Sequence, residues 1–260
     1  MSAVVDSLTG TGRFLDFVMS AVRATPHTVR HYPGEIVQQT GAIIRSNALV
    51  ICFMLAMLGG LFTMAINFLF GGLGLDSYLG AAPPVVMLRG CSEVVFGWIL
   101  AAKMGCGIVA ELGSMRIGEE VDALEVMGVP SLPYLVVTKV LAALVVLPSL
   151  FVIGLGVNYM SSRWFGVSFL HGVSGGGFDT INYLFQGPRE FFIAVSWSSL
   201  VAIGVTLIAC YFGYTAAGGP VGVGHNTAKS MLVNLIYISV SAMVLAQTFY
   251  GQTPGSPLGN

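Results

Sequence analysis

Five long apolar stretches, separated by short polar segments, dominate the chain. Residues 47–70 contain no charged side chain. As a helix that rises about 1.5 Å per residue they reach about 36 Å, enough to cross a hydrocarbon layer of about 30 Å. Four further stretches have similar length and character. The pattern predicts five spanning helices, over about 47–70, 81–112, 134–160, 190–216 and 230–250.

A shorter amphipathic stretch precedes the first span. Phe14, Val18 and Val22 recur at four-residue steps, and polar or charged residues occupy much of the rest of residues 11–25. This spacing is typical of a helix that lies in the plane of the lipid headgroups, although packing of the same helix against the first span fits equally well. We therefore expect an all-α integral membrane protein. Its parts are an N-terminal cytoplasmic or interfacial helical segment over 1–46, a membrane domain over 47–250 and a tail over 251–260.

Composition narrows the class of protein further. Hydrophobic residues make up 55% of the 260 residues and charged residues 9%, whereas soluble domains carry about 25% charged residues. A soluble globular protein is thereby excluded, and a net charge of −1 gives no sign of nucleic-acid binding. The four cysteines lie in apolar stretches without a C-x-x-C pair, and the four histidines are scattered. We therefore expect buried thiols and no metal site.

Basic residues set the predicted orientation, because cytoplasmic loops carry an excess of Lys and Arg. Six such residues fall in the N-terminal segment and in the loops after the second and fourth spans, and two fall on the opposite side. We predict a multi-pass protein of the plasma membrane with a cytoplasmic N-terminus and an external C-terminal tail. The six are Arg13, Arg23, Arg30, Arg45, Arg116 and Lys229, and the two are Arg163 and Arg189.

The segment over residues 110–128, between the second and third spans, holds five of the twelve acidic residues. Ile117, Val121 and Leu124 follow a helical spacing that forms one apolar stripe, with acidic side chains on the other faces. Ser114 is placed to cap the start of such a helix. We predict a short amphipathic cytoplasmic helix over about 114–128 whose acidic face docks a basic protein partner, and a solvated connector is the alternative. The five acidic residues are Glu111, Glu119, Glu120, Asp122 and Glu125.

The second span itself contains four charged residues, and an ionisable side chain in mid-membrane costs about 2.5–3.5 kcal/mol. Arg89 and Glu93 are four residues apart, so they can pair on one helix face. Lys103 and Glu111 are about two turns apart and also share a side. We expect this span to face protein or a wet cavity. Internal ion pairs that orient the helices and a polar lining beside a substrate path both fit the pattern.

The acidic segment resembles the MlaE/YrbE family of ABC-transporter permeases, and in particular the YrbE proteins encoded with Mce (mammalian cell entry) proteins in actinobacteria. The residues that carry the resemblance are Ala110-Glu111-Leu112-Gly113, Met115-Arg116 and the run from Glu119 to Gly128. Two positions depart from the family pattern. A family motif Arg-Glu-Leu-Gly-Pro reads Arg89-Gly90-Cys91-Ser92-Glu93 here, and a family arginine is replaced by Lys103.

The resemblance implies a five-span permease domain over 47–250 and a transport subunit without catalytic residues. It implies a sister YrbE-type permease in a hetero- or homodimer, a cytoplasmic ABC ATPase dimer and Mce-type external channel proteins as partners. ATP and Mg²⁺ would bind the ATPase, with no cofactor on this chain. The substrate would be a lipid (phospholipid, fatty acid or sterol), with import as the usual direction. The residues that it assigns to ATPase coupling are Arg116, Glu119, Glu120, Asp122, Leu124 and Glu125.

The absence of a G-x-x-x-x-G-K-[ST] phosphate loop from the sequence agrees with an ATPase on a separate chain. A membrane-embedded enzyme that modifies lipids is the alternative, but it would need a convergent set of nucleophile, base or metal ligands. The acids of 111–125 contain no paired D-x-x-D pattern with a downstream partner. A proton-coupled secondary transporter could use Glu93 and Lys103 as a relay, but no internal repeat supports it.

Overall fold

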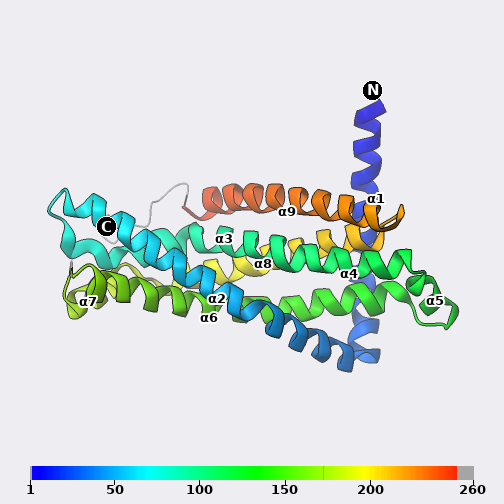
Figure 1. Ribbon diagram of the computed structural model, residues 1–260, viewed down its shortest axis with the longest axis horizontal. Helices are drawn as coiled ribbons and strands as arrows, with labels where there is room; N and C mark the ends of the chain where they lie inside the picture. The colour runs from blue at the N-terminus through cyan, green and yellow to red at the C-terminus, as the bar shows by residue number, and fades with distance from the viewer. Residues whose placement is uncertain (1, 172, 251–260) are drawn as a thin grey trace. The chain divides into compact units, whose positions relative to one another are not determined.

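The computed structural model describes residues 2–171 and 173–250, with side chains for all of these except residues 2–9, 11 and 77. The predicted external tail over 251–260 lies outside the described residues. Within the described part the chain is helical almost throughout and contains no strand, as Figure 1 shows. Five segments are long and apolar enough to cross a membrane, which confirms the all-α integral membrane fold. They cover Pro33–Gly71, Tyr78–Ile117, Leu132–Phe169, Pro188–Tyr214 and Gly219–Tyr250.

The spanning segments extend beyond the apolar stretches that predict them. α2 (Pro33–Gly71) begins well before residue 47, because proline suits the first position of a helix and the polar residues that follow do not interrupt it. The second and third spans are each built from several helical pieces. The second comprises η1 (Asp76–Ala81), η2 (Pro83–Cys91), α3 (Ser92–Ile99), η3 (Leu100–Gly105) and α4 (Cys106–Ile117), and the third comprises η4 (Leu132–Val137), α6 (Thr138–Arg163) and η5 (Trp164–Phe169).

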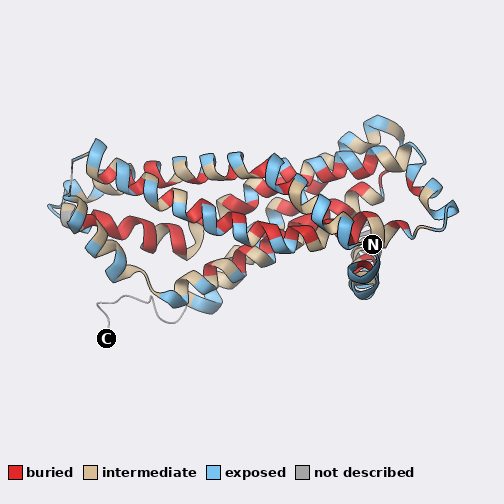
Figure 2. Cartoon of the chain, turned by 90° about the horizontal axis from the view of Figure 1, so that it is seen from below, coloured by how far each residue is buried: buried red, intermediate tan, exposed pale blue. Residues whose placement is uncertain are grey.

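The described chain forms two compact units. The first contains the residues up to Arg45, Leu100–Val146 and Ile203–Ile236, and the second contains Ser46–Ile99, Leu147–Ala202 and the residues from Tyr237 onward. In each unit the buried residues lie on the inward faces of the helices, as the red bands of Figure 2 show. The remaining elements are α1 (Ser2–His31), α5 (Glu120–Val126), α7 (Gly175–Phe185), α8 (Pro188–Tyr214) and α9 (Gly219–Tyr250).

In the first unit, α1 packs against η4 of the third span, whereas its sequence suggested the first span as the packing partner. One face packs on the protein: Phe17, Ala21 and Thr28 are buried, and the Thr28 hydroxyl donates to the Pro133 carbonyl at 3.3 Å. The opposite face leaves apolar side chains exposed, including Leu15 at 57%. A helix with one packed face and one exposed apolar face suits the membrane surface.

In the second unit, polar side chains of α6 form hydrogen bonds to the backbone of α2. The Asn158 amide donates to the Leu55 carbonyl at 2.7 Å, and the Ser162 hydroxyl donates to the Gly59 carbonyl at 3.1 Å. Small and polar residues are the usual contacts between spanning helices, because lipid offers no hydrophobic drive for helices to associate. These bonds fix the register of the two helices.

α7 lies in the segment that the sequence pattern predicts only as a loop between the third and fourth spans. Ser174 caps it by accepting a hydrogen bond from the Gly177 amide at 3.2 Å. Arg163, at the end of α6, forms a bidentate ion pair with Asp179 of α7, with N–O distances of 2.9 and 3.1 Å. Such a paired geometry orients α7 on the end of the third span.

Candidate functional site

The acidic loop, which we define as residues 118–131, joins α4 to η4 and contains α5. α4 continues to Ile117, and the chain turns at Gly118 and Glu119 before α5 begins. Glu119 has a φ of 59°, in the left-handed region that non-glycine residues seldom occupy. A short helix is present as predicted, but a single helix over 114–128 is wrong because this turn divides it. Ser114 caps nothing: its hydroxyl donates to the Glu111 carbonyl inside α4.

An ion pair holds the beginning of α5. The Arg116 guanidinium donates to an Asp122 carboxylate oxygen at 2.6 Å, and it lies 6.0 Å from the ring centre of Tyr214, the last residue of α8. The pair is partly exposed, with side-chain accessibilities of 37% and 58%, so it contributes about 1 kcal/mol or less. Its effect is mainly geometric, because it positions α5 against the end of the fourth span.

A hydrogen-bonded chain holds the other end of the loop. The Ser131 hydroxyl, which is buried, donates to a Glu125 carboxylate oxygen at 2.5 Å and also lies 2.7 Å from the Tyr214 hydroxyl. With its one proton given to Glu125, the Ser131 oxygen accepts from Tyr214. Tyr214 therefore braces both ends of the acidic loop, and sequence reasoning missed both Tyr214 and Ser131.

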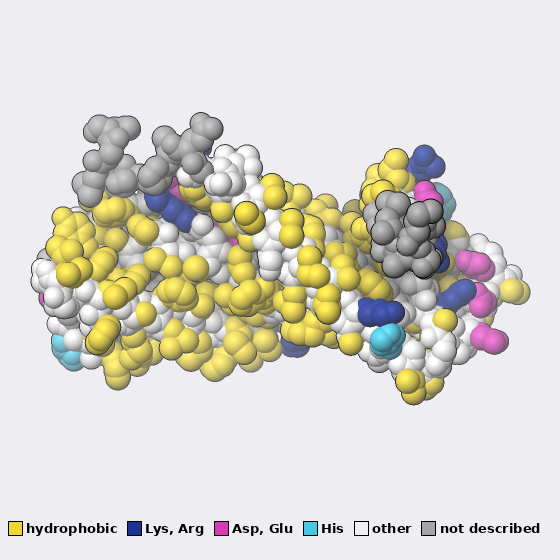
Figure 3. All heavy atoms as spheres, turned by 90° about the horizontal axis from the view of Figure 1, so that it is seen from above, with side chains coloured by type: hydrophobic (Ala, Val, Ile, Leu, Met, Phe, Trp, Pro, Cys, Tyr) yellow, Lys and Arg dark blue, Asp and Glu magenta, His cyan; other side chains and the backbone are white. Residues whose placement is uncertain are grey.

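The remaining side chains of the loop project outward. Glu119 and Glu120 are exposed, and no side-chain hydrogen bond or ion pair involves them among the described residues. Val126 is 90% exposed and Met127 69%, although both are apolar. Figure 3 shows acidic side chains gathered at this end of the visible face and hydrophobic side chains over much of the rest. These two apolar side chains lie beside the exposed carboxylates and add an apolar contact to the outward face of the loop.

The apolar stripe predicted for this segment is only partly present. Val121 is fully buried and anchors α5, Leu124 is half-buried, and Ile117 belongs to α4 instead. The roles that the sequence assigns to Arg116, Glu119, Glu120, Asp122, Leu124 and Glu125 in coupling remain predictions. What the structure adds is a division among them: Arg116, Asp122 and Glu125 brace the loop, whereas Glu119 and Glu120 are presented to solvent.

Beneath the loop, a buried lysine joins three elements of the first unit. The Lys139 ammonium donates to Glu111 of α4 at 2.8 Å and to the Gln39 side chain of α2 at 3.2 Å. The Gln39 amide in turn donates to Glu35 at 2.9 Å. Glu111, which shares a side of the second span with Lys103 in the sequence pattern, thus pairs with a residue of α6. Lys103 is exposed on η3.

The predicted pair of Arg89 with Glu93 is wrong. The helix breaks between them, because Gly90 has a φ of 147°, which only glycine adopts easily. Arg89 instead approaches Glu190 of α8 at 3.8 Å. Glu93 is fully buried, and no described side chain donates a hydrogen bond to its carboxylate, which faces the backbone amides of Gly90 and of Glu93 itself.

Other buried polar atoms of the second unit share this condition. The hydroxyls of Ser92 and Tyr159 and the indole nitrogen of Trp197 are also buried without a hydrogen-bond partner in the described part. Glu93 and Tyr159 are close enough to interact electrostatically. Buried polar groups are nearly always hydrogen-bonded in stable proteins, so these positions are unusual.

An apolar pocket of about 440 Å³ also lies in the second unit, where α2 ends and η1 and η2 begin. Ile66, Phe70, Tyr78 and Val85 contribute to its wall, together with Phe185 at the end of α7. None of the residues that line it is charged. Its size falls within the range of about 300–1,000 Å³ that is usual for small-molecule sites.

Comparison with known proteins gives the family. The profile of the family described as Permease MlaE matches residues 36–248. A protein of Arabidopsis thaliana named TRIGALACTOSYLDIACYLGLYCEROL 1, chloroplastic, is 28% identical over 82% of this chain and 61% of its own length. A probable ABC transporter permease protein of Porphyra purpurea is 31% identical over 75% of this chain and 74% of its own length. One from Rickettsia bellii is 28% identical over 67% of each chain.

The family profile covers nearly all of the five apolar segments and the whole acidic loop, and it agrees with the resemblance that the acidic segment carries. The helical membrane fold described above provides the architecture that a permease needs. The matches show the family and do not show the actinobacterial, Mce-associated assignment. The chain belongs to the MlaE family of permeases and is a multi-pass membrane subunit of the ABC-transporter type.

Proposed function

We propose that the chain is the permease subunit of a multi-subunit lipid transporter of the Mla and Mce type, driven by an ATPase on a separate chain. The cytoplasmic ATPase dimer docks on the acidic loop and supplies ATP and Mg²⁺. A sister permease and Mce-type external proteins complete the assembly, which moves phospholipid, fatty acid or sterol, with import as the direction. The N-terminus and the acidic loop lie on the cytoplasmic side.

One observation carries the coupling part of this proposal: the acidic loop is braced from within and presents other residues outward. Tyr214 ties the loop to the fourth span through Arg116 and Ser131. A force applied to the acidic loop is therefore transmitted to the fourth spanning helix, because these contacts keep the loop from bending. Glu119 and Glu120 provide the charge, and exposed Val126 and Met127 provide the apolar contact, that a basic partner surface would engage.

Two observations support a lipid as the substrate. The Arabidopsis relative has trigalactosyldiacylglycerol in its name, and that compound is a lipid. The pocket bordered by Ile66, Phe70 and Phe185 is apolar and has room for part of an acyl chain. The buried polar atoms around Glu93 lie in the same unit and suit a more polar group.

The docking test uses charge reversals that spare the internal braces. Glu119→Lys with Glu120→Lys should abolish co-purification of a chain that binds and hydrolyses ATP, identified by mass spectrometry after gentle detergent extraction. The single reversal Glu120→Lys is compared with Asp76→Lys, a single reversal on η1 in the other unit that should keep the ATPase. Normal membrane insertion of each variant is checked by its yield and gel-filtration profile.

Retention of the ATPase by the double variant, with ATP-dependent transport intact, would refute docking on this surface. The substrate is tested in proteoliposomes of the co-purified assembly, with labelled phospholipid, fatty acid and sterol offered separately. We expect ATP-dependent relocation of at least one of them without chemical change. A chemically altered lipid produced by this chain alone would favour the enzyme alternative instead.

A further inference from the structure

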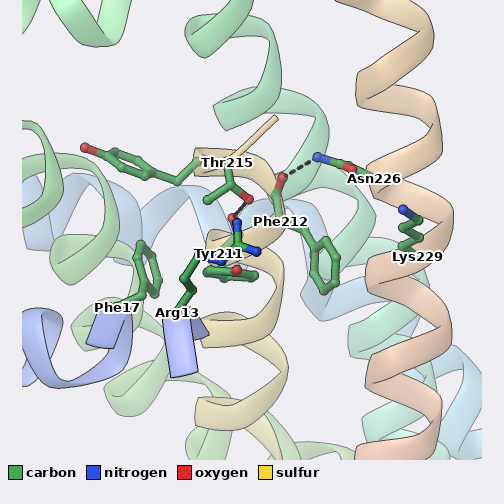
Figure 4. A pocket seen from close by; sticks show the side chains of 8 residues that line it. Arg13, Phe17, Tyr211, Phe212, Thr215, Asn226 and Lys229 are labelled. Atoms are coloured by element: carbon green, nitrogen blue, oxygen red, sulfur yellow. Dashed lines mark hydrogen bonds between the residues drawn. The ribbon is translucent and has the colours of Figure 1, made fainter. Parts of the chain in front are cut away.

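A polar pocket of about 400 Å³ in the first unit lies between α1, the end of α8 and the first part of α9. Figure 4 shows Arg13 and Phe17 extending from α1 toward Tyr211 of α8, with Asn226 and Lys229 on α9 beyond Phe212. The sequence pattern alone does not predict a pocket at this place. Its wall comprises Arg13, Phe17, Tyr211, Phe212, Tyr214, Thr215, Asn226 and Lys229.

The pocket has the chemistry of an anion site. Arg13 and Lys229 bring two positive charges to it from different helices, and none of the eight described residues that line it is acidic. The Asn226 amide donates one hydrogen to the Phe212 carbonyl at 3.1 Å, and an amide carries two, so a second donor remains. A guanidinium, an ammonium and an amide around one cavity suit a phosphate group.

The sequences of the two spans place this pocket at the level of the lipid headgroups. Residues 230–250 of α9 contain no charge and cover about 32 Å as a helix, which matches the hydrocarbon thickness. Lys229 is the residue immediately before this stretch. Residues 191–214 of α8 are likewise uncharged and end at Tyr214, on the pocket wall. Lys and Tyr are residues that anchor spanning helices at this depth.

α1 gives independent support for the same depth. Beside the pocket its exposed face carries Leu15 at 57%, Met19 at 55% and Val22 at 61% exposure. A helix that exposes apolar side chains beside basic ones lies at the boundary of headgroups and acyl chains. Arg13 projects from this helix toward Tyr211. Three segments distant in the sequence therefore meet at one depth, with two of them contributing a cation.

The aromatic wall is already packed. Tyr211 meets the rings of Phe14 and Phe17 edge to face, with centroids 5.3 and 5.5 Å apart, and Phe17 also lies 5.9 Å from Tyr214. Little ordering is needed when a ligand enters a wall that is formed in advance, and the affinity rises accordingly. The aromatic surfaces suit the glycerol and upper acyl carbons that accompany a lipid phosphate.

We propose that this pocket binds the phosphate group of an anionic phospholipid, held by Arg13 and Lys229, as a bound constituent of the permease. The site is separate from the apolar pocket at the end of α2, which lies in the other unit. It does not depend on which lipid the transporter moves. Tyr214 lines this pocket and also braces the acidic loop, so the bound lipid borders the residue that carries the loop.

The test measures lipid binding to the full-length chain in detergent by native mass spectrometry. Phosphatidylglycerol and phosphatidylcholine are titrated separately, and inorganic phosphate is added as a soluble competitor. Each basic side chain near an anionic headgroup gives about a five-fold gain in affinity, so Arg13→Gln with Lys229→Gln should weaken phosphatidylglycerol binding about 30-fold. Lys229→Gln alone, at an exposed position, should weaken it about five-fold.

Arg23→Gln with Arg30→Gln is the matched control, because it removes two exposed cations from α1 that do not line the pocket. This control should keep the wild-type affinity. Equal losses in both double variants would show a diffuse basic surface and overturn the site. Displacement of the lipid by millimolar phosphate would identify a soluble anion site instead. Loss of ATPase co-purification at unchanged lipid affinity would assign the pocket to a protein partner.

Discussion

Ser131→Ala tests whether the acidic loop is held by the hydrogen-bonded chain that ends at Tyr214. The Ser131 side chain is 1% exposed and touches both a Glu125 carboxylate oxygen and the Tyr214 hydroxyl. Replacement by alanine removes one oxygen and leaves the backbone and the shape of the site unchanged. The ion pair of Arg116 with Asp122 stays in place, so only the second end of the loop is released.

The expected loss follows from the two hydrogen bonds. A neutral bond contributes about 0.5–1.5 kcal/mol and a bond to a charged group about 1.5–3 kcal/mol. Glu125 is exposed and Tyr214 is half-buried, so water can replace the lost partner of each. The lower ends of both ranges therefore apply, and together they give about 2 kcal/mol. The open population of the loop should rise about 30-fold, because 1.4 kcal/mol corresponds to a factor of ten.

Amide hydrogen exchange measured by mass spectrometry on peptides that cover residues 118–131 reports this population directly. We expect exchange there to accelerate about 30-fold, with peptides from α6 unchanged. Ser199→Ala is the matched control, because the Ser199 hydroxyl donates to the Val195 carbonyl of its own helix. Exchange of the loop within about three-fold of the wild-type rate in Ser131→Ala would refute the bracing argument.

Three further predictions concern thermal unfolding in detergent. Glu111→Gln should lower the free energy of unfolding by about 2 kcal/mol, because it leaves the buried ammonium of Lys139 without its counter-ion. Lys139→Met should lower it by less than about 1 kcal/mol, because it removes that charge. The reverse order of the two losses would contradict this account. Glu93→Met should leave the midpoint of unfolding unchanged or raise it, since the carboxylate is fully buried and no described side chain donates to it. A clear drop in the midpoint would contradict this account. Gly213→Ala should cost about 1–3 kcal/mol, because a Cβ there lies 2.8 Å from a side chain of α4. Gly156→Ala, which faces open space, should stabilise by up to about 1 kcal/mol, and equal effects at both glycines would exclude tight packing of α8 on α4.

The class of the fold and the position of the acidic segment follow from local sequence. Uncharged stretches of more than twenty residues have only the helix as a spanning structure, since lipid offers no partner for backbone groups. The same local reasoning places the acidic segment between the second and third spans. It could not give the turn at Glu119, because a left-handed conformation at a non-glycine residue is imposed by the contacts on either side.

Partner choice was the least predictable feature of the charged residues. Helical spacing favours a pair of Arg89 with Glu93, but one glycine between them redirects the arginine to Glu190, about a hundred residues away. Lys139 appears in the sequence only as a charge near the start of the third span. Its contacts with Glu111 and Gln39 exist because three helices converge there.

What the sequence determined by itself was the membrane-spanning pattern, the all-α class and the concentration of acid in one loop. Hydropathy and charge act residue by residue, so they can be read along the chain. The tertiary structure alone decided which carboxylates face solvent, that Tyr214 braces the acidic loop, and that Arg13 and Lys229 share a pocket. These depend on helices distant in the sequence packing side by side, and the energies that select one such packing are sums over contacts that no local pattern contains.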